Sequence, residues 1–371
     1  MAVRPAARSV HGGNLGCVVA GWKVDVLRRG GRERPTSVAP AFSGWDAGAN
    51  YIRPNTRGRD SRGAGWPTSI GMHESAIWVH DERGDWPLSS EGLVTSVPAF
   101  LSKTTNYSGR TSARFSADGR FLFYLMRRDS PASASELWRR DLESGNSQAV
   151  LRGVSIVDYD LSSDGKEAVF STQPPGKASQ IWLAKLDGSS PPKLIASTGE
   201  SAPRLGPEDE VVFEFSDGKA NYIGRIRKHG SARSKLVSNS IADLHTISPD
   251  RRWVVAGVPA APVAFPTREG SPRRICANEC AVSWAPDGKF LYLGVERSSR
   301  TSTGKTVAIP VPPGQTFPNL PASGIRGIED AKALPGARVL DRYDISPGLD
   351  PSVYAYTKTT VHRNLYRISV P

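Results

Sequence analysis

Six polar or charged residues recur at one equivalent position along the chain, and they suggest a binding site. Each lies four residues before an acidic residue in a tight turn, or before Gly348, which takes that place in the last copy. The six residues are Arg114, Asp160, Arg204, Thr246, Ser283 and Asp344. Because equal positions of a repeat share one orientation, we expect a ring that binds a small ligand, an ion or a peptide end. The alternative, a hydrogen-bonded ring that only satisfies buried polar groups, is the more common arrangement.

Motifs for catalysis are scarce in this sequence. There is no Gly-x-Ser-x-Gly elbow, and the six histidines are scattered along the chain. Asp158 and Asp160 form an Asp-x-Asp pair that could bind a cation, although such a pair alone is weak evidence. The sequence therefore predicts a protein that is not an enzyme and needs no cofactor. A hydrolase or lyase that collects its catalytic side chains at one site of the fold is the alternative.

Three cysteines exclude a scaffold built on many disulfides. Cys276 and Cys280 are close enough in sequence to form a bridge or to share a metal ion. Since no further cysteine or histidine lies nearby, the spacing is a weak metal pattern. We predict no metal site.

A repeated hairpin positions the ring residues, and its best-preserved copy covers residues 281–293. Two apolar runs flank the turn Pro286-Asp287-Gly288. Proline presets the φ of the first turn position, aspartate bonds its own backbone, and glycine accepts a positive φ. The acidic turn residues Asp118, Asp164, Glu208, Asp250 and Asp287 follow one another at intervals of 46, 44, 42 and 37 residues.

Each repeat contains two strands around the acidic turn, a third strand and a short fourth strand. Four strands in about 40–45 residues are typical of a β-propeller blade, whose innermost strand lines a central channel. The third strands lie around Trp78, Trp138, Trp182, Tyr222, Val263, Thr306 and Tyr366. The sequence thus predicts an all-β propeller of four-stranded antiparallel blades, with seven blades expected and six as the alternative. A short helix is expected within residues 328–334.

The positive charge of the chain is concentrated near its N-terminus. Of the net charge of +12, residues 1–68 carry eleven Lys and Arg against four Asp and Glu. Residues 1–66 lack a hydrophobic period, so we predict a disordered or poorly ordered basic segment before a propeller over residues 67–371. Nucleic acid is expected as a partner only through this basic segment. No signal peptide or membrane-spanning segment is apparent, which leaves the cytoplasm and the periplasm open.

The turn phrases carry a resemblance to known propellers. Phe115-Ser-Ala-Asp-Gly, Ile247-Ser-Pro-Asp-Arg and Trp284-Ala-Pro-Asp-Gly resemble the repeats of TolB-type, WD-like propellers. Residues 67–371 also resemble the C-terminal sensor propellers that bacteria fuse to serine/threonine kinases or winged-helix regulators. The segments that carry this second resemblance are residues 75–81, 88–92, 274–276 and 363–371.

These resemblances imply a non-catalytic module that binds a protein or peptide partner or senses a small ligand. The chain departs from the pattern at two points. The Gly-His and Trp-Asp pairs of true WD repeats are missing, and no kinase or winged-helix pattern precedes the propeller.

Overall fold

The structure of this 371-residue chain is a computed structural model. It describes the backbone of residues 17–19, 22–26, 53–54, 65–88, 93–94, 113–127, 134–259, 261–297, 304–343 and 345–369. Side chains are described for residues 76–88, 113–127, 134–259, 261–295, 304–343 and 345–358.

The chain divides into two units. One contains residues 75–358, and the other contains residues 1–74 and 359–371. In the second unit β1 (Cys17–Val19) pairs with β2 (Trp22–Val26), and β3 (Arg53–Pro54) pairs with backbone positions 68 and 69. The predicted lack of order in residues 1–66 otherwise falls outside the described residues. Within the described residues, no helix is long and apolar enough to cross a membrane.

The larger unit consists of antiparallel four-stranded sheets, which we number as blades 1 to 6. Blade 1 contains β7 (Arg114–Phe115), β8 (Phe121–Arg127), β9 (Glu136–Asp141) and β10 (Ser147–Leu151). Blade 2 contains β11 (Ile156–Leu161), β12 (Glu167–Thr172), β13 (Gln180–Lys185) and β14 (Lys193–Ala196). Blade 3 contains β15 (Ser201–Leu205), β16 (Glu210–Ser216), β17 (Asn221–Arg227) and β18 (Ser234–Lys235).

The remaining blades follow the same plan. Blade 4 contains β19 (Asp243–Ile247), β20 (Trp253–Val258), β21 (Ala261–Pro266) and β22 (Arg273–Arg274). Blade 5 contains β23 (Ala281–Trp284), β24 (Phe290–Arg297), β25 (Gly304–Pro310) and β26 (Arg338–Leu340). Blade 6 contains β27 (Ile345–Pro347), β28 (Tyr354–Ser369), β4 (Gly65–Asp81) and β5 (Gly84–Pro87). The short β6 (Leu93–Val94) pairs with the far end of β8.

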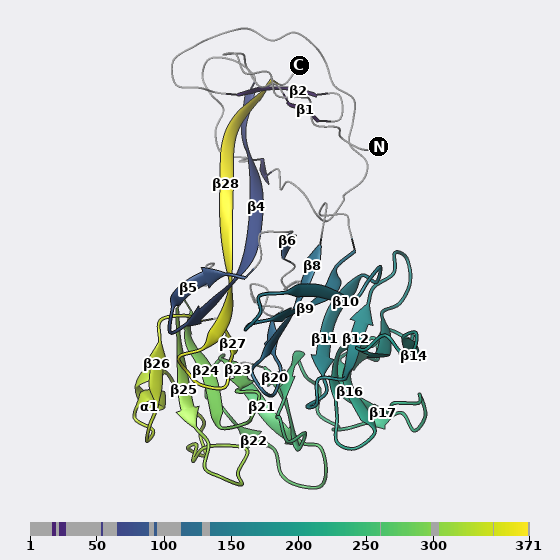
Figure 1. Ribbon diagram of the computed structural model, residues 1–371, viewed down its shortest axis with the longest axis vertical. Helices are drawn as coiled ribbons and strands as arrows, with labels where there is room; N and C mark the ends of the chain where they lie inside the picture. The colour runs from purple at the N-terminus through teal and green to yellow at the C-terminus, as the bar shows by residue number, and fades with distance from the viewer. Residues whose placement is uncertain are drawn as a thin grey trace. The chain divides into compact units, whose positions relative to one another are not determined.

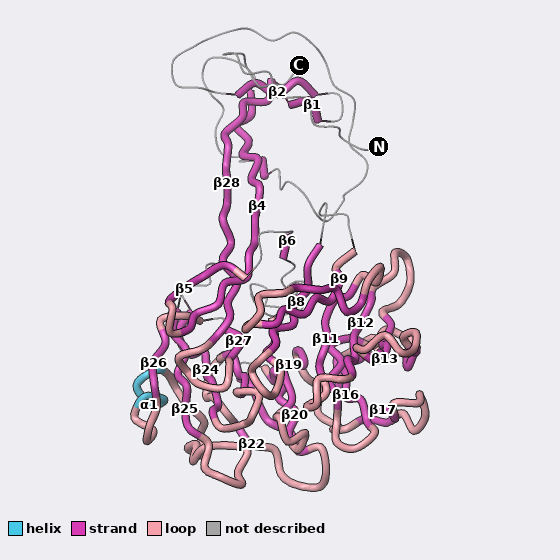
Figure 2. Tube along the Cα trace, viewed as in Figure 1, coloured by secondary structure: helices cyan, strands magenta, loops and turns pink. Residues whose placement is uncertain are grey.

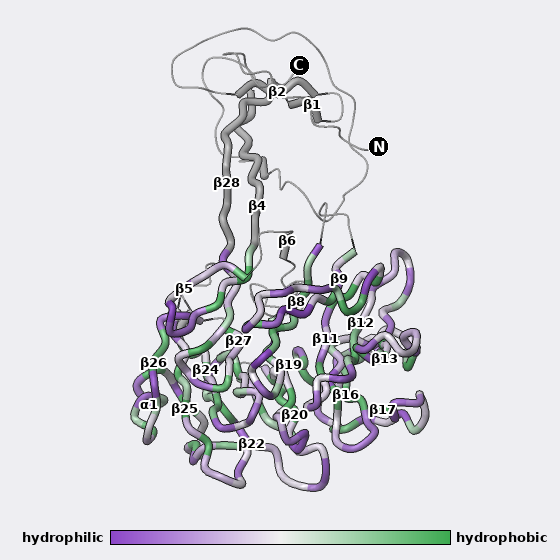
Figure 3. Tube along the Cα trace, in the orientation of Figure 1, coloured by the Kyte–Doolittle hydropathy of each residue, from purple (hydrophilic) through white to green (hydrophobic). Residues whose placement is uncertain are grey.

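In blades 1 to 5 the second strand contains a continuous apolar run, because neighbouring blades cover both of its faces. In β8, the five residues from Leu122 to Met126 are all buried. In β16, Val211, Val212 and Phe213 are completely buried. Figure 2 shows that strands joined by turns make up most of the unit, and Figure 3 shows hydrophilic residues gathered in the turns. The predicted all-β propeller of four-stranded antiparallel blades is therefore confirmed.

Blade 6 shows that the prediction of seven blades is wrong. The strands around Trp78 and Tyr366, assigned in sequence to a first and a seventh blade, are β4 and β28 of this single sheet. In Figure 1 the blue β4 runs alongside the yellow β28. The turn phrase marks where a blade begins, but it does not reveal that one blade is built from two distant segments. The structure therefore has six blades, the alternative number.

Side-chain contacts join the two segments of blade 6. The His80 ring stacks on the Tyr354 ring with 4.7 Å between their centroids. Arg342 Nη2 donates to Asp85 Oδ2 over 3.3 Å, and the guanidinium lies 3.9 Å from the centre of the Tyr356 ring. Next to blade 1, Ser346 Oγ donates to the backbone carbonyl of Ala113. These contacts close the ring of blades.

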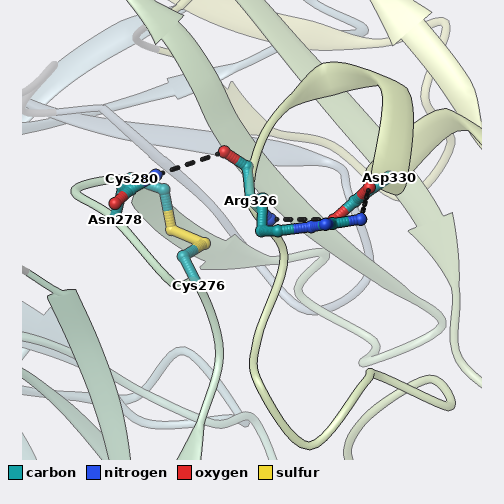
Figure 4. The surroundings of a disulfide bond; sticks show 5 residues. All are labelled: Cys276, Asn278, Cys280, Arg326 and Asp330. Carbon is teal, nitrogen blue, oxygen red and sulfur yellow. Dashed lines mark hydrogen bonds and ion pairs between the residues drawn. A yellow bond between two sulfur atoms is a disulfide. The ribbon is translucent and has the colours of Figure 1, made fainter.

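The segment between β25 and β26 packs on blade 5 and carries α1 (Ile328–Lys332), the expected short helix. Cys276 and Cys280 form a disulfide beside this segment, so their thiolates are not available to a metal. Figure 4 shows the bridge, the Asn278 amide that donates to the Arg326 carbonyl, and the Arg326–Asp330 ion pair. Together these contacts hold the loop before blade 5 against the segment.

Ile77 provides a test of ring closure. It lies on β4, is completely buried, and packs in the core shared by blades 6 and 1. We expect Ile77→Ala to lower the free energy of unfolding by about 2–5 kcal/mol, because it leaves a cavity in that core. Leu194→Ala, at an exposed position, should lower it by about 0.5 kcal/mol or less. Urea unfolding measures both, and equal effects would contradict the placement of β4 in the ring.

Candidate functional site

A cavity of about 280 Å³ lies at the centre of the six blades. Residues of all six innermost strands line it, and Arg114, Asp160, Arg204, Thr246 and Ser283 are among them. Asp344, the sixth residue of the sequence-based ring, lies outside the described residues. The cavity therefore collects every ring residue that the structure describes.

The strand register explains why these five residues meet. In each blade the innermost strand pairs with the second strand, and the ring residue forms the last pair but one before the turn. The pairs are Arg114↔Phe123, Asp160↔Val169, Arg204↔Val212, Thr246↔Val255 and Ser283↔Tyr292. Equal places in the register give equal depth along the channel. The repeated turn thus positions one side chain per blade.

Arg204 is the most buried charged residue of the site, with 3% of its surface exposed. Its Nη1 donates to Asp158 Oδ2 and to the Pro203 carbonyl, both over 2.8 Å. Its Nη2 donates to the His245 carbonyl over 3.0 Å. A buried guanidinium is tolerated because these acceptors replace the lost water. One side chain thereby ties blade 3 to blades 2 and 4.

Asp160 forms a second set of bonds between blades. Its Oδ2 accepts from the Leu205 backbone N–H over 3.0 Å and from Arg251 Nη1 over 2.7 Å. Burial acts to raise the pKa of Asp160, but Arg251, Arg114 and Arg204 outweigh it, and the pKa lies below its ordinary value. The carboxylate is therefore ionised, and two donors hold its Oδ2.

Arg251 reaches Asp160 from the turn between β19 and β20. It stands where the turn phrase has glycine, and its φ of 61° lies in the left-handed region. That conformation costs a residue other than glycine about 1 kcal/mol or more. In return, Arg251 Nη2 also donates to the Leu161 carbonyl over 2.7 Å. An unfavourable backbone conformation is thus held by two bonds to blade 2.

A group of three titratable side chains lies beside these ion pairs. His245 Nε2 and Asp243 Oδ1 are 3.0 Å apart, and Glu214 Oε2 accepts from the Leu244 backbone N–H over 2.9 Å. Burial raises the pKa of the Glu214 carboxyl to about 7; the Leu244 bond opposes this effect and nearby Asp243 adds to it. A side-chain carbon on Gly257 would lie 2.4 Å from Asp243 Oδ1, so glycine leaves the room for this group.

The residues of blades 5 and 6 with described side chains form an uncharged wall of the same cavity. Ala281, Val282, Ser283, Ile345 and Ser346 lie there. Among the described side chains of the cavity, the charged ones lie on blades 1 to 4. The cavity thus has one charged side and one side of small or apolar residues.

The cation site considered for Asp158 and Asp160 is not supported, because guanidinium groups occupy both carboxylates. In the part of the chain with described side chains, no three His, Cys, Asp or Glu residues are placed to hold a metal ion.

Several site residues were missed in the sequence: Arg251, Glu214, Asp243 and His245. Arg251 could have been found, since it replaces the glycine of the turn phrase. Glu214 lies at the end of an apolar strand, where a charged residue is unusual. No sequence pattern identifies Asp243 and His245, because their side chains meet only through a bulge in β19.

Comparison with known proteins supports the fold. No protein-family profile and no curated protein matches the sequence. The structure is similar to a putative TolB from Agrobacterium tumefaciens, with a TM-score of 0.52 and 14% identity over 78% of this chain and 99% of that chain. A TolB from Acinetobacter baumannii gives 0.45 and 14% identity over 70% of this chain and 60% of that chain. An oligogalacturonate lyase in complex with manganese gives 0.44 and 11% identity over 87% and 97%. The chain has a TolB-like β-propeller fold.

The Arg204–Asp158 pair should be strongly coupled. We expect Arg204→Met to lower the free energy of unfolding by about 3–5 kcal/mol, because Asp158 is then buried without its partner. Adding Asp158→Asn to that variant should restore part of the loss. Arg120→Met, at an exposed ion pair with Asp141, should have a much smaller effect. A double-mutant cycle in urea measures the coupling, and strictly additive effects would argue against a buried pair.

Glu214 should make stability depend on pH near neutrality. Its folded-state pKa of about 7 exceeds the ordinary value of 4.5, so the folded protein holds this proton more tightly. The resulting stabilisation is complete below the ordinary value and disappears as the pH rises through the folded-state pKa, a change of about 3 kcal/mol. Glu214→Gln should flatten this slope, whereas Glu279→Gln, an exposed control, should keep it. A wild-type curve without the decline between pH 5 and 7 would refute the prediction.

Proposed function

We propose that this propeller is a non-catalytic sensing module, which binds a ligand in its central cavity and presents its surface to a protein partner. The observation that carries the proposal is the cavity of about 280 Å³, lined by all six inner strands. A molecule bound there would contact every blade. Its binding would therefore stabilise the whole ring.

The bonding of the charged residues favours binding over catalysis. Arg204 and Arg251 donate to carboxylates and backbone carbonyls, and Asp158 and Asp160 accept from them. These bonds hold the charged side chains in place and leave fewer lone pairs and protons for a substrate. The charged wall thus acts mainly as a rigid frame.

The finer part of the proposal concerns the biological setting. The chain resembles sensor propellers that are fused to bacterial serine/threonine kinases or winged-helix regulators. The resemblance rests on residues 75–81, 88–92, 274–276 and 363–371. In such an arrangement, the occupied propeller would act on a partner domain through its surface. A protein or peptide partner is accordingly part of the proposal.

The second candidate function is a hydrolase or lyase that works in the same cavity. The observation that favours it is the Asp243–His245 pair next to Glu214, whose pKa of about 7 suits proton transfer near neutral pH. The two candidates differ in the fate of the bound compound. An enzyme converts it, and Glu214→Gln then slows that conversion by about 10²-fold or more. A sensing module releases it unchanged, as mass spectrometry after incubation would show.

A cavity-filling variant tests the proposed function. Ser283→Phe places a ring in the cavity, and Ser190→Phe places the same ring on an exposed turn. In a thermal-shift screen of amino acids, sugars, nucleotides and organic acids, we expect at least one compound to raise the Tm of the wild type. The rise should be about 5 °C at a hundredfold excess over Kd. Ser190→Phe should keep the response and Ser283→Phe should lose it. If no compound stabilises the wild type, or Ser283→Phe responds equally, the cavity is not a binding site.

A further inference from the structure

Arg114 differs from the other arginines of the cavity because its guanidinium has no short bond to a carboxylate. It lies on β7 and lines the cavity, and a third of its side chain (33%) is exposed. Within the described part of the chain, its side chain makes no hydrogen bond. Its nearest carboxylate oxygen, Asp158 Oδ1, is 3.9 Å from Nη2, too far for a hydrogen bond. Five N–H donors are therefore available at the cavity surface.

Arg114 is the guanidinium of the ion-pair cluster that has no short bond to a carboxylate. Three guanidinium groups, those of Arg114, Arg204 and Arg251, face the two carboxylates of Asp158 and Asp160. Arg204 and Arg251 take the short bonds of 2.8 and 2.7 Å to these carboxylates. Arg114, the most exposed of the three, has no described carboxylate within hydrogen-bond distance.

The surroundings of Arg114 hold it in place without neutralising it. Its guanidinium carbon lies 5.5 Å from the centre of the Tyr159 ring, within the range of a cation–π interaction. Tyr159 is itself buried. The guanidinium is thus oriented before any ligand arrives, which lowers the entropy lost on binding.

The rest of the cavity sets the shape and polarity of the ligand. Blade 6 is the neighbour of blade 1 in the ring. Among the residues with described side chains, those that blades 5 and 6 contribute to the cavity are uncharged and include Ala281, Val282, Ser283, Ile345 and Ser346. A ligand bound to Arg114 would therefore rest its remaining atoms on small and apolar groups. The cavity therefore suits a ligand with one negatively charged group and a short apolar part.

We propose that the cavity binds a small organic monocarboxylate, with the carboxylate paired to Arg114 and the apolar body against blades 5 and 6. The proposal rests on the binding function proposed for the cavity. A planar carboxylate matches the parallel N–H donors of one guanidinium. A monocarboxylate brings one negative charge to the guanidinium, whereas a phosphate dianion would bring a second negative charge next to Asp158, whose Oδ1 lies 3.9 Å from Arg114 Nη2.

Titration calorimetry with benzoate, butyrate and the neutral benzamide tests this proposal. Wild-type protein should bind the two carboxylates and not benzamide. Arg114→Gln should weaken carboxylate binding about tenfold or more, because it removes the charge and the paired donors. Arg114→Lys, which keeps only the charge, should bind with intermediate affinity. Arg152→Gln removes an exposed charge elsewhere and should bind like the wild type.

Three results would overturn the proposal. They are equal binding of benzoate and benzamide, unchanged carboxylate binding by Arg114→Gln, and inorganic phosphate binding as tightly as the carboxylates. Urea unfolding confirms that each variant is folded. If Arg114→Gln does not fold, the carboxylate affinity of Arg114→Lys decides, and an unchanged affinity would overturn the proposal.

The cavity-filling variant separates this proposal from the broader one. If another class of compound binds the wild type but not Ser283→Phe, and carboxylates do not bind, the sensing function stands and the carboxylate proposal fails. If no compound distinguishes wild type from Ser283→Phe, both fail. Carboxylate binding that Ser283→Phe and Arg114→Gln each abolish supports both.

Discussion

The buried guanidinium of Arg204 is the interaction on which the centre of this propeller depends. A charge without water is costly, and its burial is tolerable only when every acceptor stays in place. Here the acceptors come from Asp158 of blade 2, the strand of Arg204 itself and the backbone of His245 in blade 4. Three consecutive inner strands are therefore held at one mutual spacing by a single side chain. The neighbouring Asp160–Arg251 bond repeats this arrangement at the end of the channel where the turns lie.

This arrangement makes the ring asymmetric. Blades 2, 3 and 4 are joined at the centre by charged bonds. Blades 5 and 6 meet through an apolar and aromatic cluster, the Thr306 bond to the Tyr343 carbonyl and the exposed Arg338–Asp350 ion pair. The charged side is rigid because any displacement leaves a buried ion without its partner. The uncharged side provides space. A binding cavity needs both properties, and the six-fold repeat provides them by placing different residue types at equal positions.

Much of the fold could be predicted from the sequence because it rests on local rules. The turn phrase, its acidic residue and its glycine act within a few residues, so the inner hairpins and five members of the polar ring follow from their spacing. The turn after Arg204, around Glu208, departs from the repeated turn sequence. Arg204 still lines the cavity, because its pairing with Val212 in the strand register sets its position. The blade number was missed because no local pattern tells that β4 and β28 share a sheet. Asp243 and His245 were missed because their meeting depends on a bulge. The substitution of Arg251 for glycine is visible in the sequence, but its partners in blade 2 are not.

Blade 6 also imposes an order of events on the synthesis of this protein. Its outer strands β4 and β5 leave the ribosome before the strands of the other five blades, yet the edge of β4 that receives β28 stays open until β28 is made. Asp85 and Arg342, which meet across the closed blade, are 257 residues apart in the chain. Contacts of such long separation form slowly and leave a strand edge exposed to wrong partners in the meantime. The hairpin of β4 and β5 must therefore wait, without its partner strand, until β28 has been synthesised. The wall of the channel is complete only when β27, the last inner strand, is in place.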